Sequence, residues 1–255
     1  MIFRFIPEPL RSLLSAANHR RKSDRIRCVR GAHGKSCLLV MNGPSLNQSI
    51  ECLQARVTDG VIAVNHFADT EHFDVLRPEF YVLQDSYFWQ PDAMQTYLEK
   101  RDATFQSLNR KTSWKMQLWL PSQCSRNAWI DEQIHNPNID ICYWNSGFIR
   151  RRRREGGFLG TSSMLFRLWR QEWASPPPDN VLVAALYIAE RLGFSDLSVI
   201  GADFSFFREM RVDQETNRVG RKVEHFYGEE FRPIYRGKTG EHPTTMAHEM
   251  FRWHR

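Results

Sequence analysis

Six short apolar runs constrain this chain more than any other feature of its sequence. They are four or five residues long, almost free of charge, and lie at residues 37–41, 61–64, 80–83, 116–120, 139–143 and 197–200. Such runs are typical of parallel strands that are buried on both faces. Stretches long enough for helices separate several of them, and strands that alternate with helices form α/β domains. We therefore predict one Rossmann-like α/β domain with a mostly parallel sheet over residues 36–255.

Two longer segments of this domain have distinct patterns. Residues 180–192 read NVLVAALYIAERL and follow three prolines, which predicts a helix with Asp179 as N-cap and Gly193 as C-cap. Residues 204–245 are polar and irregular, rich in Arg, Glu and Gly. This second segment is too long for an idle connection, so we predict a lid or active-site loop there.

The positive charge of the chain is concentrated in its first 36 residues. They hold nine Lys and Arg against two acidic residues, whereas the other 219 residues hold 26 against 27. A nearly neutral body does not support a nucleic-acid-binding surface. Residues 1–35 are therefore a basic N-terminal segment attached to the domain.

Within this segment the apolar residues follow a helical spacing, with Leu10, Leu13, Leu14 and Ala17 at i, i+3, i+4 and i+7. Basic residues at 19–22 follow this stripe. Such an amphipathic helix can lie on an anionic membrane surface, or it can dock on its own domain with its charges in solvent.

The chain has no apolar run of 18 residues and its N-terminus does not resemble a secretory signal, so we expect a cytoplasmic protein. Peripheral contact with the inner face of the cytoplasmic membrane stays open. Five scattered cysteines without a CxxC motif indicate reduced thiols and neither zinc nor disulfides.

Polar residues follow the first three apolar runs at the points where strands would end. Asn42, Gly43 and Ser45 follow the first, Asn65 the second, and the pair Gln84-Asp85 the third. Sequential parallel strands are often neighbours, and α/β sheets bind ligands at the carboxyl ends of their strands. Gly43 permits a close backbone approach, and amides at a following helix start can hold a phosphate.

Two further residues could take part in chemistry. Asp203 follows the last apolar run, where its carboxylate can orient a substrate hydroxyl or an imidazole, or can cap a helix. His225 lies in the predicted lid and can act as a general base near neutral pH, or be incidental. The five arginines at 150–154 form either an anion site or a solvated loop. No Asp-x-Asp pair follows a strand, so no metal site is predicted.

Taken in order, five motifs resemble a known family: NGPSL at 42–46, VN at 64–65, QDS at 84–86, GADF at 201–204 and HFYG at 225–228. The set resembles the bacterial sialyltransferases of glycosyltransferase family 42 and related proteins of surface-polysaccharide and flagellin glycosylation. The resemblance covers roughly residues 36–250. It implies a GT-A-like variant of the Rossmann-like domain, with a lid, that binds a CMP-activated acidic sugar without a metal and inverts the anomeric carbon.

The resemblance also implies roles for individual residues. A lid histidine would be the base, and Asp203 would belong to the family's Gly-x-Asp motif. The donor nucleotide and its phosphate would be held by Asn42, Gly43, Ser45 and Asn65, with Gln84 or Asp85 in place of a donor-contacting Asn, and Asn180 near a Thr-Ser pair of the family.

The sequence departs from the family at two points. Ser205 stands where the sialyltransferases place a phosphate-binding Tyr, and Arg208 or Arg211 can take that role because guanidinium binds phosphate well. Glu229 stands where the family places its catalytic His, so His225 and Glu229 are both candidate bases. The chain also ends in a helix-like stretch, 245–255, where the family continues into a strand.

The leading hypothesis is an inverting, cofactor-independent glycosyltransferase. It would transfer sialic acid or another nonulosonate from a CMP donor to a surface glycan or lipid-linked oligosaccharide. One alternative is an enzyme like the archaeal-type pterin diphosphokinases, which would need ATP and Mg²⁺. Another is a non-catalytic module in polysaccharide assembly. The sequence does not identify the donor sugar or the acceptor, and it leaves homo-oligomerisation open.

Overall fold

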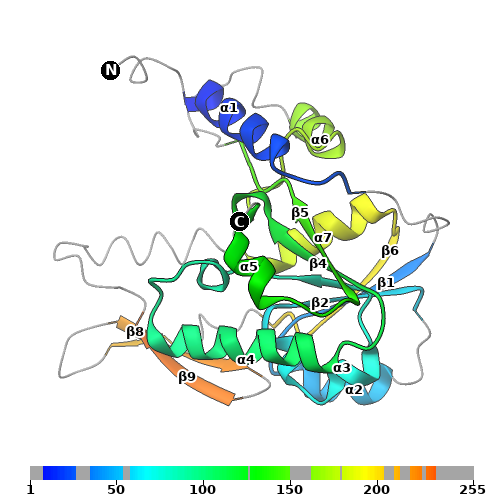
Figure 1. Cartoon of the computed structure of the whole chain (residues 1–255), viewed down its shortest axis with the longest axis vertical. Helices are drawn as coiled ribbons and strands as arrows, with labels where there is room; N and C mark the ends of the chain where they lie inside the picture. The colour runs from blue at the N-terminus through cyan, green and yellow to red at the C-terminus, as the bar shows by residue number, and fades with distance from the viewer. Residues whose placement is uncertain are drawn as a thin grey trace.

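A computed structural model of the 255-residue chain shows an α/β domain (Figure 1). The structure describes residues 8–26, 35–53, 58–125, 127–149, 162–178, 180–203, 210–212, 219–225 and 228–233.

The centre of the domain is a sheet of six parallel strands in the order β5-β4-β3-β2-β1-β6. The strands are β1 (Ser36–Val40), β2 (Gly60–Val64), β3 (Phe80–Val82), β4 (Met116–Pro121), β5 (Ile139–Trp144) and β6 (Asp196–Ile200). Each predicted apolar run coincides with a strand to within one residue at either end. The predicted Rossmann-like class with a parallel sheet is therefore confirmed.

Helices cover both faces of the sheet. The connections between β1 and β5 contain α2 (Leu46–Leu53), η2 (Asn65–Asp69), α3 (His72–Leu76), η3 (Ser86–Phe88), α4 (Gln95–Lys111), η4 (Ser122–Cys124) and α5 (Ala128–Gln133). The connection from β5 back to β6 contains α6 (Ser162–Arg170) and α7 (Val181–Leu192). Right-handed crossovers that run in opposite directions along a sheet fall on opposite faces.

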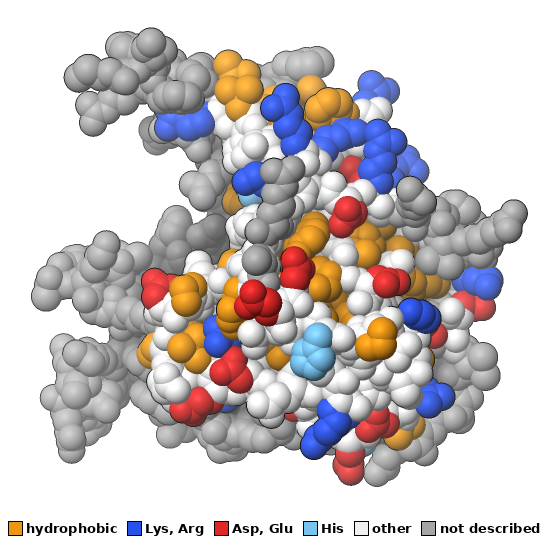
Figure 2. Space-filling model, viewed as in Figure 1, with side chains coloured by type: hydrophobic (Ala, Val, Ile, Leu, Met, Phe, Trp, Pro, Cys, Tyr) orange, Lys and Arg blue, Asp and Glu red, His pale blue; other side chains and the backbone are white. Residues whose placement is uncertain are grey.

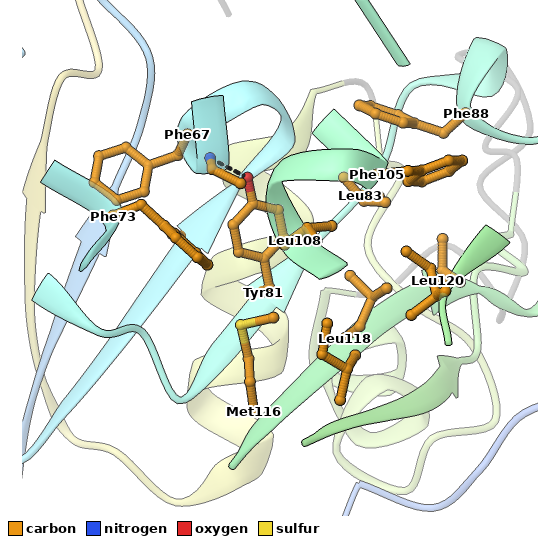
Figure 3. Packing of buried hydrophobic residues seen from close by; sticks show 14 of the residues in the cluster. Phe67, Phe73, Tyr81, Leu83, Phe88, Phe105, Leu108, Met116, Leu118 and Leu120 are labelled. Carbon is orange, nitrogen blue, oxygen red and sulfur yellow. Dashed lines mark hydrogen bonds between the residues drawn. The ribbon is translucent and has the colours of Figure 1, made fainter. Parts of the chain in front are cut away.

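Each face has its own core, because neighbouring residues of a strand point to opposite sides. Leu38 packs on the side of α4, whereas Leu39 packs on the side of α7. Figure 3 shows the first core, in which Tyr81 lies among Phe73, Leu108 and Met116. Cover on both sides explains why the strands are almost free of charge.

Of the two residues predicted to cap helix α7, one is correct and one is not. Asn180 is the N-cap, with its side chain accepting a hydrogen bond from Val183 N at 3.2 Å, so the expected N-cap Asp179 is wrong. Asn180 already has the extended conformation of an N-cap, and its amide oxygen reaches the third helical residue. Gly193 is confirmed as C-cap, with φ of 100°.

The predicted N-terminal helix is α1 (Glu8–Arg21), and it docks on the domain. Ala16 is fully buried with Ile149 and Ala174, and side chains of α6 pack against this cluster. Gly147 permits the approach, because a Cβ there would lie 2.6 Å from Ala16 Cα. One stripe of α1 is therefore occupied by the protein itself. Among the described helices, none combines the length and hydropathy that a bilayer crossing requires.

The segment predicted as a lid or active-site loop, residues 204–245, contains β-strands. The strands β7 (Met210–Val212), β8 (Val219–His225) and β9 (Gly228–Pro233) form an antiparallel sheet in the order β7-β8-β9. The sequence pattern predicts a lid or active-site loop here and does not predict these strands. Antiparallel strands need only one apolar face, so their polar sequences hide them from a search for apolar runs. The arginine run 150–154 and the helix-like stretch 245–255 lie outside the described residues.

Three of the five cysteines, Cys37, Cys124 and Cys142, are free thiols in the described part of the chain. Burial, together with nearby Glu79, raises the pKa of Cys37 to about 12 from 9.0. Burial likewise raises the pKa of Cys142 to about 12 and that of Cys124 above its ordinary value.

These thiols predict alkaline destabilisation. A thiol that ionises at higher pH in the folded state stabilises the fold fully below pH 9, and this stabilisation is lost as pH rises toward 12. For Cys37 the limit is about 4 kcal/mol, at about 1.4 kcal/mol per pKa unit. Urea unfolding between pH 8 and 11 should show a falling free energy of unfolding. The free energy of unfolding should fall less steeply with pH in the Cys37→Ala variant than in the unaltered protein. Equal slopes in the two proteins would show that the Cys37 thiol does not cause the alkaline destabilisation.

Candidate functional site

The strand order reverses at β1, and loops from both sides of this point meet there. β1 leads toward β2 on one side, while β6 lies on the other. Across the gap Gly43 N donates to Gly201 O at 2.7 Å, and Ser45 N donates to Asp203 Oδ2 at 3.0 Å. Open α/β sheets generally bind ligands outside the carboxyl ends of the strands at such a switch point.

Two glycines make this meeting possible. A Cβ on Gly43 would meet Asp203 Oδ2 and would lie 2.5 Å from Gly201 O. Gly201 has φ of 66°, in the left-handed region, and a Cβ there would lie 2.6 Å from Met41 O. The β1–α2 turn is therefore fixed directly against the end of β6.

Asp203 takes one of the two roles considered for it. Its carboxylate accepts from Ser45 N, directly before α2 begins at Leu46, so it holds the start of that helix. Since the amides of Gly43 and Ser45 are both bound within the protein, this turn does not offer them to a phosphate. A donor phosphate would need other partners, such as the arginines that follow Asp203.

Asn65, Gln84 and Asp85 form a second group at the ends of β2 and β3. Asn65 Nδ2 donates to Asp85 Oδ2 at 2.9 Å, and Gln84 N donates to Asn65 Oδ1 at 3.3 Å. Asn65 has φ of 47° and is 9% exposed. Both ends of its amide are bound, so Asn65 positions its two neighbours.

Two amide oxygens at this edge are buried and accept no hydrogen bond from the described residues. They are Asn42 Oδ1 and Gln84 Oε1. The other end of each amide is fixed, because Asn42 Nδ2 donates to Val64 O at 3.0 Å and Gln84 Nε2 donates to Pro178 O at 3.2 Å. The second bond brings the segment before α7, including the N-cap Asn180, next to β3. We call Asn42, Gly43, Ser45, Asn65, Gln84, Asp85 and Asp203 the carboxyl-edge cluster.

A chain of hydrogen-bonded polar side chains runs inward from the exposed Asp85 to the buried His66 and Thr104. Tyr87 OH lies 3.3 Å from Asp85 Oδ2 and 2.6 Å from His66 Nε2. His66 Nδ1 lies 2.8 Å from Thr104 Oγ1, which donates to Asp69 Oδ2 at 2.7 Å. The sequence pattern points to Asn65 but gives no role to His66, Tyr87 or Thr104. The chain ties Asp85 to α4 and restrains its carboxylate.

Tyr81, which is buried in the core, stabilises the turn that follows β2. Its hydroxyl donates to Asn65 O and accepts from Ala68 N, the bond drawn in Figure 3. This buried hydroxyl fixes the turn in which Asn65 has its positive φ.

Replacing Tyr81 by Phe should therefore destabilise the protein by about 1–3 kcal/mol, because a buried N–H and a buried C=O lose their partner. Urea unfolding measures this change. The matched control is Tyr143→Phe, whose hydroxyl makes no hydrogen bond with the described residues, and it should change stability by less than about 0.5 kcal/mol. Equal effects of the two substitutions would contradict this role of Tyr81.

A polar pocket of about 300 Å³ lies farther along the same edge, between α1 and the ends of β4 and β5. His19 lines it, with Nδ1 2.9 Å from Ser122 Oγ, and Ser122 Oγ lies 3.1 Å from Ser146 Oγ. Burial and nearby Lys22 lower the pKa of His19, which favours the neutral ring. The sequence indicated only a basic run here, so this histidine was missed as a candidate base.

The structure thus brings seven predicted site residues to one sheet edge, with Asn180 close by through Pro178. Ser205 and Arg208 lie outside the described residues. The backbones of His225 and Glu229 lie in the β8–β9 hairpin, where His225 pairs with Gly228 and Glu229 with Glu224, and their side chains are outside the description. Within the described ranges, no three His, Cys, Asp or Glu side chains gather as metal ligands would.

We compared the chain with protein-family models and with curated protein sequences. No protein-family model matches the chain, and no curated protein sequence matches it.

Proposed function

We propose that the protein is an inverting, metal-independent glycosyltransferase whose carboxyl-edge cluster binds a CMP-activated acidic sugar. The donor would carry sialic acid or another nonulosonate, and the acceptor would be a surface glycan or lipid-linked oligosaccharide. The observation that supports this most is the pair of buried amide oxygens, Asn42 Oδ1 and Gln84 Oε1, beside the switch point. A buried acceptor without a partner costs about 1–3 kcal/mol, which a donating ligand would recover.

A nucleotide suits these two oxygens. Cytosine presents an amino group as donor, and ribose hydroxyls both donate and accept. Amide side chains fixed at their nitrogen ends, as those of Asn42 and Gln84 are, present their oxygens in a set direction. The choice of CMP among nucleotides comes from the resemblance of the strand-end motifs to the bacterial sialyltransferases.

The proposed reaction is a direct displacement. The acceptor hydroxyl oxygen forms a bond to the anomeric carbon, while the bond from that carbon to the phosphate oxygen breaks and CMP leaves with the electron pair. The hydroxyl proton passes to a base, His225 or Glu229. Arg208 would neutralise the leaving phosphate and Ser205 would donate a hydrogen bond to it, because the amides of the β1–α2 turn are already bound.

The test is a transfer assay with CMP-sialic acid and a set of oligosaccharide acceptors, with and without EDTA. We expect CMP release that depends on the acceptor and is unchanged by EDTA. Release of AMP from ATP with Mg²⁺ and a hydroxymethylpterin would support the diphosphokinase alternative. Tight CMP binding without turnover of any donor would support the non-catalytic module. Either of the last two results would contradict the proposal.

A further inference from the structure

The side of the molecule formed by α1 and α6 exposes an unusual share of apolar side chains. Seven large apolar residues are exposed in the described part of the chain, and four lie on α1, on α6 or just after α6. Their exposed fractions are 48% for Leu10, 54% for Leu14, 57% for Phe166 and 45% for Trp173. The opposite side of these helices packs against the domain through Leu13, Ala16 and Leu168, so the four exposed side chains lie on the outward side. We call this surface the α1–α6 face.

The same face is strongly basic. Residues 8–26 and 162–173 contain seven Lys and Arg against three acidic residues. Figure 2 shows blue side chains beside orange ones at the top of the molecule, over α1 and α6. An apolar surface mixed with cations in this way differs from the separate apolar patch of a typical protein interface, whose core is depleted in charge.

A pocket of about 370 Å³ opens within this basic region. Four guanidinium groups line it, those of Arg20, Arg25, Arg170 and Arg191, together with Gln171, Glu172 and Trp173. The lining carboxylate is already bound on both oxygens, since Glu172 Oε1 lies 3.3 Å from Arg191 Nη2 and Glu172 Oε2 accepts from Ile26 N at 3.3 Å. Neither Arg25 nor Arg170 forms an ion pair with a described residue. The pocket therefore has an excess of positive charge.

The wall of the pocket is held in place. Arg20 Nη1 donates to Gln171 O at 3.1 Å, and its Cζ lies 3.9 Å from the centre of the Trp173 ring. Glu172 has φ of 57°, and its carbonyl accepts from Asn145 Nδ2 at 2.9 Å. A guanidinium stacked on an aromatic ring keeps its edge free for a bidentate contact with phosphate.

We propose that the α1–α6 face docks on an anionic phospholipid bilayer and that the arginine pocket receives a lipid phosphate. A bilayer surface offers a suitable environment for each kind of side chain on this face. Lipid phosphates can bind the arginines, and the hydrocarbon layer can receive Leu10, Leu14 and Phe166. Tryptophan is enriched at the interface between these two layers, where Trp173 would lie. Because the face carries an excess of positive charge, we expect it to bind an anionic bilayer in preference to a neutral apolar partner. The proposal does not depend on the nucleotide site.

Co-sedimentation of the full chain with vesicles tests it. One set of vesicles contains phosphatidylcholine alone, and the other contains an equal part of phosphatidylglycerol. We expect binding to the mixed vesicles only, weakening as salt rises. Arg25→Gln and Arg170→Gln should each weaken binding about fivefold, at about 1 kcal/mol per cation. Leu14→Ser with Phe166→Ser should weaken it at least as much.

Matched controls are available elsewhere on the surface. Val75 is 60% exposed on α3 and Arg110 is exposed on α4, so Val75→Ser and Arg110→Gln should leave vesicle binding unchanged. Equal binding to pure phosphatidylcholine, or no loss in the arginine variants, would overturn the proposal. So would a dimer in solution that Leu14→Ser dissociates while vesicles are not bound, since the face would then pair with a second copy. Stabilisation by inorganic phosphate without vesicle binding would show a soluble anion site instead.

Discussion

Gly43→Ala is expected to lower the free energy of unfolding by about 1–3 kcal/mol and to weaken nucleotide binding at least tenfold. The added methyl group would overlap Asp203 Oδ2 and would lie 2.5 Å from the backbone oxygen of Gly201. Overpacking of this kind typically costs 1–3 kcal/mol, and a backbone atom cannot turn away as a side chain can. The β1–α2 turn must therefore move, and Asn42 moves with it. Urea unfolding and titration with CMP measure the two effects.

Gly60→Ala is the control that separates stability from the site. Gly60 begins β2 at the opposite edge of the sheet, and a Cβ there would lie 2.6 Å from the Phe194 ring. This variant should lose stability and keep its affinity for CMP. If both variants bind CMP as the unaltered protein does, the switch point is not the nucleotide site.

His225→Ala is expected to reduce sugar transfer by a factor of 10² to 10⁴, the usual contribution of a general base, with the affinity for CMP unchanged. The reason is the place of His225 in the lid motif that resembles the sialyltransferases, at the end of β8 where the hairpin turns. Initial rates with CMP-sialic acid, beside the dissociation constant of CMP, distinguish loss of chemistry from loss of binding.

Two further variants identify the base if it is not His225. Glu229→Gln removes the carboxylate that stands at the family's catalytic position. His19→Gln removes the neutral imidazole beside the polar pocket under α1 while leaving a side chain that can still reach Ser122. Full activity in His225→Ala would contradict the assignment of His225 as the general base. A loss of activity in only one of Glu229→Gln and His19→Gln would then identify that residue as the base.

The sheet could be predicted because its determinants are local. Each apolar run, such as 61–64, has the pattern of a strand buried on both faces, and each of them coincides with a strand of the parallel sheet. Strands β8 and β9 could not be found this way, because charged residues interrupt their apolar positions and their pairing depends on a hairpin. The N-cap of α7 was misplaced by one residue, since Asp179 and Asn180 are both good caps and only the backbone conformation decides between them.

The members of the carboxyl-edge cluster were predictable from the sequence, but their contacts were not. Polar residues that follow parallel strands must meet at one edge, so Asn42, Asn65 and Asp85 were expected together. Which of them faces a ligand depends on hydrogen bonds across strands, and these bind Asn65 to Asp85 and Asp203 to Ser45. The chain through His66 and Tyr87 depends on the packing of α4, which no local pattern reveals.

The central claim is that the strand ends at the carboxyl edge form a nucleotide site. Calorimetric titration with CMP in the presence of EDTA tests it most directly, with the unaltered protein and the variants Gln84→Met and Gln117→Met compared. Both glutamines have a buried Oε1 without a partner among the described residues, but Gln117 lies near the start of β4, away from the carboxyl edge. We predict that the unaltered protein and Gln117→Met bind CMP equally, whereas Gln84→Met binds at least tenfold more weakly. No binding to the unaltered protein, or equal binding by all three, would contradict the claim that these strand ends form a nucleotide site.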